Sequence, residues 1–85
     1  MSTITIYGNE SCAFCGAARM LLTKKGIKFE DILVSNDAEK RAEMEARSQQ
    51  RSVPQIFIGD KHVGGFEELC DLDKSGELDK LLADS

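Results

Sequence analysis

The chain has 85 residues, a net charge of −4 and a hydrophobic content of 41%. We expect a single small domain over residues 1–85, which excludes a second catalytic domain and a large enclosed cavity. The mildly acidic charge gives no electrostatic reason to bind nucleic acid or an anionic membrane surface, and no apolar run approaches the roughly 20 residues that cross a bilayer.

The first part of the chain predicts a βαβ unit. β-Prone residues at 3–7 indicate a strand, and apolar residues at helical spacing predict a helix over 12–25 that ends at Gly26. A second strand is expected at 28–34. Because a crossover through a helix joins parallel strands, these two strands are expected to pair in parallel.

A highly charged segment follows. Asn36 is the expected N-cap of a helix over 37–48, with Glu39 completing a capping-box pattern. Glu43 and Arg47 are one helical turn apart, so we expect them to pair on a solvated helix face.

The remainder predicts a β-hairpin and two short helices. Residues 55–58 form the clearest strand, and a turn leads back into a strand at 62–63. Helices are expected at 66–73 and 77–83, separated by a Ser-Gly break. The order βαβαββαα predicts an α/β fold with a four-stranded mixed sheet flanked by helices, in which chemistry tends to lie at the carboxyl ends of the strands.

Three cysteines, Cys12, Cys15 and Cys70, define the candidate chemistry. Their odd number and the absence of a basic, apolar leader predict a reducing compartment, the cytoplasm. The Cys-X-X-Cys pair at a strand-to-helix junction is typical of a thioredoxin-like redox site. A zinc site is the alternative, but beside the pair only Cys70 and His62 remain as ligands. We expect Cys70 to be a small buried hydrophobic residue and His62 an exposed strand residue.

The start of the expected helix assigns different roles to the two paired cysteines. We expect the positive end of the helix dipole to stabilise a Cys12 thiolate and so to lower the pKa of Cys12. A larger decrease of this pKa needs N–H···S bonds or a nearby cation, and neither Asn9 nor Glu10 supplies positive charge. Cys15 is expected to be more buried, so Cys12 attacks and Cys15 resolves the mixed disulfide.

Three motifs in order resemble those of the short bacterial dithiol glutaredoxins: Cys12-Ala13-Phe14-Cys15, Ser52-Val53-Pro54-Gln55-Ile56-Phe57-Ile58 and Gly64-Gly65-Phe66-Glu67-Glu68-Leu69. The resemblance covers essentially the whole chain. It implies a thioredoxin fold and a glutathione-dependent thiol–disulfide oxidoreductase. Its substrates would be disulfides and glutathionylated mixed disulfides, in proteins above all.

The resemblance also implies a set of glutathione contacts. Val53 would pair its backbone with the tripeptide as an added strand, and Pro54 would be the family's cis-proline, although sequence alone favours trans. The start of the helix at Phe66 would hold the γ-glutamyl carboxylate, and Arg51 would meet the glycine carboxylate unless it is a loop arginine in solvent. The implied catalytic residues are Cys12 and Cys15, and the implied glutathione-binding residues are Phe14, Arg51, Val53, Pro54, Gly65, Phe66 and Glu67.

Departures from the family's pattern keep two alternatives open. Ala13 and Phe14 replace the usual Pro and Tyr, and Asn9 stands where many members have Lys. Glutaredoxins without that proline include carriers of a [2Fe–2S] cluster, in which Cys12 from two protomers and two glutathione thiolates would be the ligands. Such a cluster-bridged dimer is an alternative to the expected monomer, or an additional property; no other metal is expected. The other alternative is a thioredoxin-like donor to protein disulfides that is reduced by a reductase. Arg51 and the Gly64-Gly65-Phe66-Glu67 stretch favour glutathione instead.

Overall fold

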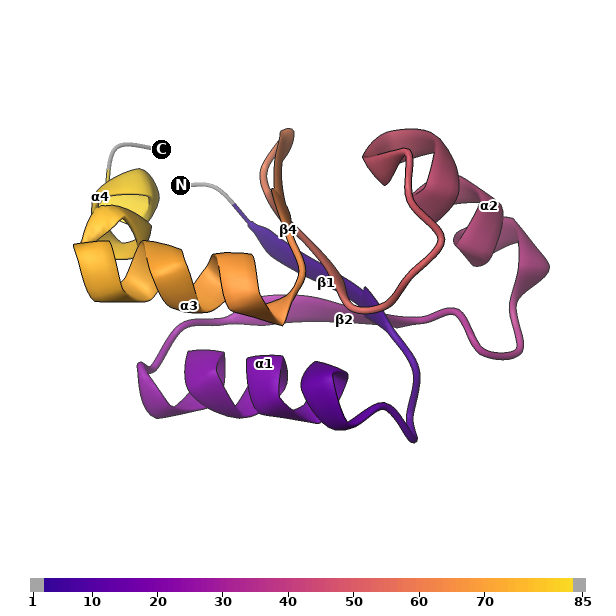
Figure 1. Ribbon diagram of the computed structural model, residues 1–85, viewed down its shortest axis with the longest axis horizontal. Helices are drawn as coiled ribbons and strands as arrows, with labels where there is room; N and C mark the ends of the chain where they lie inside the picture. The colour runs from indigo at the N-terminus through magenta and orange to yellow at the C-terminus, as the bar shows by residue number, and fades with distance from the viewer. Residues whose placement is uncertain (1–2, 84–85) are drawn as a thin grey trace.

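The computed structural model describes residues 3–83, which follow the expected order βαβαββαα (Figure 1). The strands are β1 (Ile4–Gly8), β2 (Phe29–Leu33), β3 (Gln55–Ile58) and β4 (Lys61–Gly64). The helices are α1 (Ala13–Lys24), α2 (Ala38–Ser48), α3 (Phe66–Ser75) and α4 (Glu77–Ala83). Within this described part of the chain, no helix has both the length and the apolar character needed to span a membrane.

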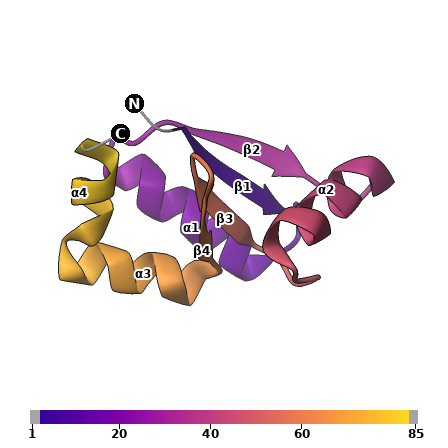
Figure 2. The ribbon, with the colours of Figure 1, turned by 90° about the horizontal axis from the view of Figure 1, so that it is seen from above.

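The strands form one mixed sheet in the order β2-β1-β3-β4 (Figure 2). β1 pairs with β2 in parallel, and β3 pairs antiparallel with both β1 and β4. This confirms the predicted crossover and hairpin. The central strands, β1 and β3, are buried along their whole length, as expected for strands covered on both faces.

Alternation along the strands divides the core between the two faces of the sheet. On one face, Ile4 and Ile6 of β1 pack with Leu22 of α1 and with residues of α3 and α4. On the other face, Tyr7 packs with Met44 of α2. Figure 1 shows α1 and α2 on these opposite sides. A short loop joins the carboxyl end of β1, a buried central strand, to the first turn of α1.

Several helix boundaries differ from the sequence-based prediction, and α1 is one residue shorter at each end than the predicted helix over 12–25. The N-cap of α2 is Asp37, not Asn36, because the Asp37 carboxylate accepts the Lys40 N–H at 3.0 Å. The Glu39 capping box is consequently not used. α3 continues through Ser75 and ends at Gly76, whose φ of +82° suits a residue without a Cβ.

The predicted Glu43–Arg47 pair on α2 is wrong, because both side chains bind Tyr7 instead. The Tyr7 hydroxyl donates to the Glu43 carboxylate, and Arg47 Nη1 donates to the same hydroxyl at 2.8 Å. The Arg47 guanidinium also lies 4.1 Å from the centre of the Phe57 ring. A buried phenol needs hydrogen-bond partners, so this face of α2 is fastened to the sheet and is not merely solvated.

Candidate active site

Cys12 is the N-cap of α1 and stands at the end of the loop that follows β1. Its Sγ accepts the Cys15 backbone N–H at 3.3 Å, which satisfies one of the N–H groups that a helix start leaves unpaired. The same sulfur lies 3.9 Å from the Val53 carbonyl oxygen, to which the thiol can donate. As the N-cap, Cys12 stands where the sequence predicted it, at the start of the helix, and the residue is half-buried.

The surroundings of Cys12 favour its thiolate. Burial raises the pKa of Cys12, but hydrogen bonds from the Cys15 thiol and from the Cys15 and Phe14 backbones, with the charge of Arg19, bring it below its ordinary value. N–H···S bonds and a cation are the two contributions that a larger decrease of this pKa requires, and both are present. The cation is Arg19, which comes from the second turn of α1 and not from the residues just before Cys12.

Cys15 differs from Cys12 in exposure and acidity. It is completely buried, which confirms the expected asymmetry. Burial and the hydrogen bond to Cys12 raise the pKa of Cys15 to about 11. The Cys12 thiol therefore ionises at a lower pH than the Cys15 thiol. This suits Cys12 as the attacking sulfur and Cys15 as the resolving one.

A cleft of about 230 Å³ lies beside Cys12, between the loop before β3 and the start of α3. Phe14 and Phe66 stand next to each other at this cleft, with ring centres 6.0 Å apart. The Phe14 side chain is 60% exposed, so an apolar surface is open to an incoming molecule. Six of the predicted glutathione-binding residues line the cleft: Phe14, Val53, Pro54, Gly65, Phe66 and Glu67.

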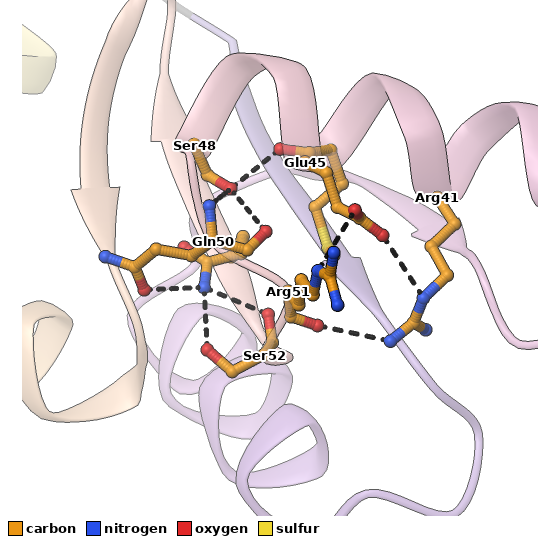
Figure 3. A network of polar contacts seen from close by, with 8 residues as sticks. Arg41, Glu45, Ser48, Gln50, Arg51 and Ser52 are labelled. Carbon is orange, nitrogen blue, oxygen red and sulfur yellow. Dashed lines mark hydrogen bonds and ion pairs between the residues drawn. The ribbon is translucent and has the colours of Figure 1, made fainter.

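Polar contacts hold the loop that forms one wall of this cleft (Figure 3). The Val53–Pro54 peptide bond is cis, as the resemblance implied. The Gln55 amide donates to the Ser52 carbonyl at 2.9 Å and to the Gln50 side-chain oxygen at 3.1 Å. The cleft lining thus includes Gln50, Ser52 and Gln55, which sequence reasoning treated only as loop and strand. The one available signal was the run of amide and hydroxyl side chains before Pro54.

Arg51 does not line the cleft. Its side chain is 89% exposed, and its Nε lies 3.7 Å from a Glu45 carboxylate oxygen on α2. Its carbonyl oxygen accepts from Arg41 at 3.2 Å, so the backbone of the loop is fixed although the side chain is not (Figure 3). Of the predicted glutathione contacts, Arg51 is the residue that the structure leaves apart from the others.

The opposite wall is the start of α3. The Gly65 N–H donates to the Glu68 carboxylate at 2.7 Å. Gly64 has a φ of +121°, and a Cβ there would lie 2.7 Å from that carboxylate, so the turn requires glycine. Glu68 is another lining residue that sequence reasoning missed. The N–H groups of the first turn of α3 lie at the edge of the cleft, where a carboxylate would be favoured.

Neither His62 nor Cys70 has the burial that the sequence predicted. His62 is half-buried, not exposed as predicted, because its Nε2 lies 2.8 Å from the Gln55 side-chain oxygen and so helps to orient that amide. Cys70 is also only half-buried. Among residues 3–83, no three or more Cys, His, Asp or Glu side chains are grouped so that they could hold a metal ion.

Adding a cation at position 9 is expected to lower the pKa of Cys12 further. Asn9 is half-buried, just ahead of Cys12. We expect Asn9→Lys to lower the midpoint of the Cys12 alkylation rate against pH by about half a unit, the effect of one nearby, partly screened charge. Thr23→Lys, which adds the same charge at the exposed far end of α1, is the matched control. Equal midpoints for the two variants would contradict the electrostatic account.

Comparisons with known proteins agree with this geometry. The sequence profile of the Glutaredoxin family matches residues 4–63. Glutaredoxin 3 of Escherichia coli (strain K12) is 44% identical over 82 residues, which cover 96% of this chain and 99% of the relative.

Solved structures agree as well. The solution structure of glutaredoxin from Brucella melitensis superposes with a TM-score of 0.83 at 45% identity, covering 96% of this chain and 89% of the other. A buckwheat glutaredoxin–glutathione complex has the same fold, with a TM-score of 0.87 at 23% identity, covering 98% of this chain and 78% of the other.

The predicted thioredoxin-like fold is thus confirmed, with a four-stranded mixed sheet flanked by helices. The two paired cysteines of the predicted motif lie close together at the start of α1. The chain therefore belongs to the glutaredoxin family and is a thiol–disulfide oxidoreductase.

Proposed function

We propose that this protein reduces disulfides and glutathionylated mixed disulfides with glutathione as the electron donor, in a reducing compartment such as the cytoplasm. The main support is the cleft beside Cys12, which is lined by the segment that leads into β3, by two aromatic rings and by the start of α3. A small peptide with carboxylates at both ends matches these three features. The Cys12 thiolate is the electron-pair donor that the reaction needs.

The proposed cycle begins when the Cys12 thiolate attacks the glutathione sulfur of a mixed disulfide. The Cys12–glutathione disulfide forms, and the substrate leaves as a thiolate. A second glutathione thiolate then attacks the glutathione sulfur, which regenerates Cys12 and yields glutathione disulfide. In the dithiol route the Cys15 thiolate attacks Cys12 Sγ instead, and glutathione leaves as a thiolate. Two glutathione molecules later reduce the Cys12–Cys15 disulfide and are oxidised to glutathione disulfide.

The cleft residues would orient the tripeptide for this attack. The Val53 backbone precedes β3 and would pair with the extended peptide as an added strand. The N–H groups at the start of α3, at Phe66 and Glu67, would hold the γ-glutamyl carboxylate. Arg51 would reach the glycine carboxylate by leaving Glu45, since an exposed ion pair at 3.7 Å contributes little free energy.

Coupled assays test the proposal. With a glutathionylated peptide as substrate, we expect rapid turnover with glutathione and its flavin reductase, and slow turnover with a thioredoxin reductase as the sole electron source. Fast reduction by the second system alone would instead support a thioredoxin-like donor. Absence of turnover with glutathione would contradict the proposal.

Arg51→Gln tests the glycine-carboxylate contact. We expect KM for the glutathionylated peptide to rise about three- to tenfold with little change in kcat, because a contact made equally in ground and transition states affects binding alone. Lys28→Gln removes an exposed positive charge that lies outside the cleft lining and is the matched control. An unchanged KM for Arg51→Gln would leave Arg51 as a solvent-exposed loop residue.

The cluster-carrier hypothesis rested on Ala13, which lies exposed in the first turn of α1. No observation in the described residues favours that alternative, so no second function is proposed.

A further inference from the structure

Arg19 is a charged residue close to the buried thiol of the site. It lies four residues after Cys15 on α1, so the two side chains leave the helix on the same face. Its Nη2 donates to the Asn9 carbonyl at 3.3 Å, and its Nε lies 3.0 Å from an Asp31 carboxylate oxygen on β2. The side chain is only 21% exposed. Contacts with two separate segments thus hold the guanidinium in one place.

Gly8, the last residue of β1, shows how closely Arg19 approaches the sulfur. A Cβ at Gly8 would lie 2.8 Å from Cys15 Sγ and 3.3 Å from Arg19 Nη2. The thiol and the guanidinium therefore border the same small space above the end of β1. Because glycine has no side chain, no atom of residue 8 beyond its backbone separates the charge from the sulfur.

We propose that Arg19 is a positioning residue for the second step of disulfide exchange, in which Cys15 attacks the mixed disulfide on Cys12. Its guanidinium stabilises the Cys15 thiolate as this forms, and its bond to the Asn9 carbonyl fixes the loop beside that sulfur. Arg19 also lowers the pKa of Cys12, but the Cys12 sulfur has in addition the N–H donors of the helix start.

The titration behaviour of the two sulfurs agrees with this assignment. Burial and the neighbouring Cys12 raise the pKa of Cys15, whereas the Asn9 backbone and the Arg19 charge oppose that rise. Cys12 and Arg19 are the charged or titratable side chains acting on Cys15, with Asp31 on β2 behind Arg19. In the mixed disulfide Cys12 no longer titrates, but burial still disfavours the Cys15 thiolate, so a neighbouring positive charge that favours this thiolate speeds the second step.

An aromatic disulfide separates the two steps. The Cys12 thiolate attacks one sulfur of the reagent, forming a Cys12–aryl disulfide and releasing one coloured aryl thiolate. Cys15 then loses its proton to solvent, and its thiolate attacks Cys12 Sγ. The Cys12–Cys15 bond forms, and the second aryl thiolate leaves with the electron pair of the broken bond. With one equivalent of reagent, the second phase is intramolecular and independent of reagent concentration.

The measurement is stopped-flow absorbance of both phases, with Cys70→Ser as the parent so that only the paired cysteines react. We expect Arg19→Met to slow the second phase about three- to tenfold and the first by less than about twofold. Each unit by which the Cys15 pKa rises lowers the fraction of Cys15 thiolate about tenfold. A more basic thiolate is also about threefold more nucleophilic, so the rate falls about threefold per unit. Arg19→Gln is expected to match Arg19→Met, and Arg19→Lys to restore most of the rate.

Lys24→Met, which removes an exposed positive charge from the last turn of the same helix, is the control and is expected to leave both phases unchanged. Circular dichroism of each variant verifies folding, and Arg19→Lys keeps the test informative if Arg19→Met does not fold. Equal slowing of both phases, or full activity of Arg19→Gln, would overturn the proposal. The assay contains no glutathione, so its outcome is independent of the proposed glutathione-dependent function.

Discussion

Replacing Cys12 with serine is expected to reduce thiol–disulfide exchange by more than about a thousandfold, because a serine hydroxyl does not ionise at neutral pH and cannot replace a thiolate. The position of Cys12 adds to the loss. Its Sγ receives the Cys15 N–H, and its pKa is below the ordinary value. Serine would keep the hydrogen bond but not the nucleophile. Turnover of a glutathionylated peptide in the coupled assay measures the effect.

Cys15→Ser and Cys70→Ser distinguish this loss from general damage. We expect Cys15→Ser to keep glutathionyl transfer, since a second glutathione can release Cys12, but to lose the dithiol reduction of protein disulfides. Cys70→Ser is expected to keep both, because Cys70 lies on α3 outside the cleft lining. Residual turnover by Cys12→Ser above a few per cent of wild type would show that another group attacks the disulfide.

The pH dependence of Cys12 follows from the direction of its pKa. Since the pKa is lowered in the folded protein, the alkylation rate rises with pH and reaches its plateau at a lower pH than that of an unfolded cysteine peptide. We expect the unfolded chain in urea to show the higher midpoint. A midpoint in the folded protein at or above the unfolded value would mean that burial outweighs the hydrogen bonds and Arg19.

Local patterns predicted most of the fold. Alternating Ile4 and Ile6 in the first strand and helical spacing around Leu22 are short-range signals, and the structure places these residues in one core. Helix boundaries were harder to predict where two neighbouring residues can both serve as the N-cap, as Asn36 and Asp37 can at the start of α2. There the choice depends on which side chain reaches the Lys40 N–H.

Contacts between distant segments could not be predicted from spacing. Glu43 and Arg47 are suitably spaced to pair, but a buried Tyr7 from another element competes for both side chains. Arg19 likewise looks like a helix-surface residue until β1 and β2 place Gly8 and Asp31 beside it. The residues of the three motifs could be predicted as parts of the candidate site. Arg19, which changes the pKa values of its cysteines, could not.

Truncation of Leu22 is the second large expected effect, and it acts on stability. Leu22 is completely buried on α1 against the sheet. Leu22→Ala removes apolar contacts and leaves a cavity, so the free energy of unfolding is expected to fall by about 2–5 kcal/mol. That is a large share of the roughly 5–15 kcal/mol that stabilises a small domain. Urea unfolding of the reduced protein measures the change.

Met20→Ala is the matched control, because Met20 lies on the same helix with 61% of its surface exposed. Its expected effect is within about 0.5 kcal/mol. A similar loss in both variants would contradict burial as the cause, since Ala is at least as good a helix former as Leu or Met. The expected difference would show that the buried face of α1, which includes Leu22, holds the helix that begins at Cys12. Leu22→Ala should then lower the midpoint of unfolding while the folded fraction keeps the Cys12 alkylation profile of the wild type.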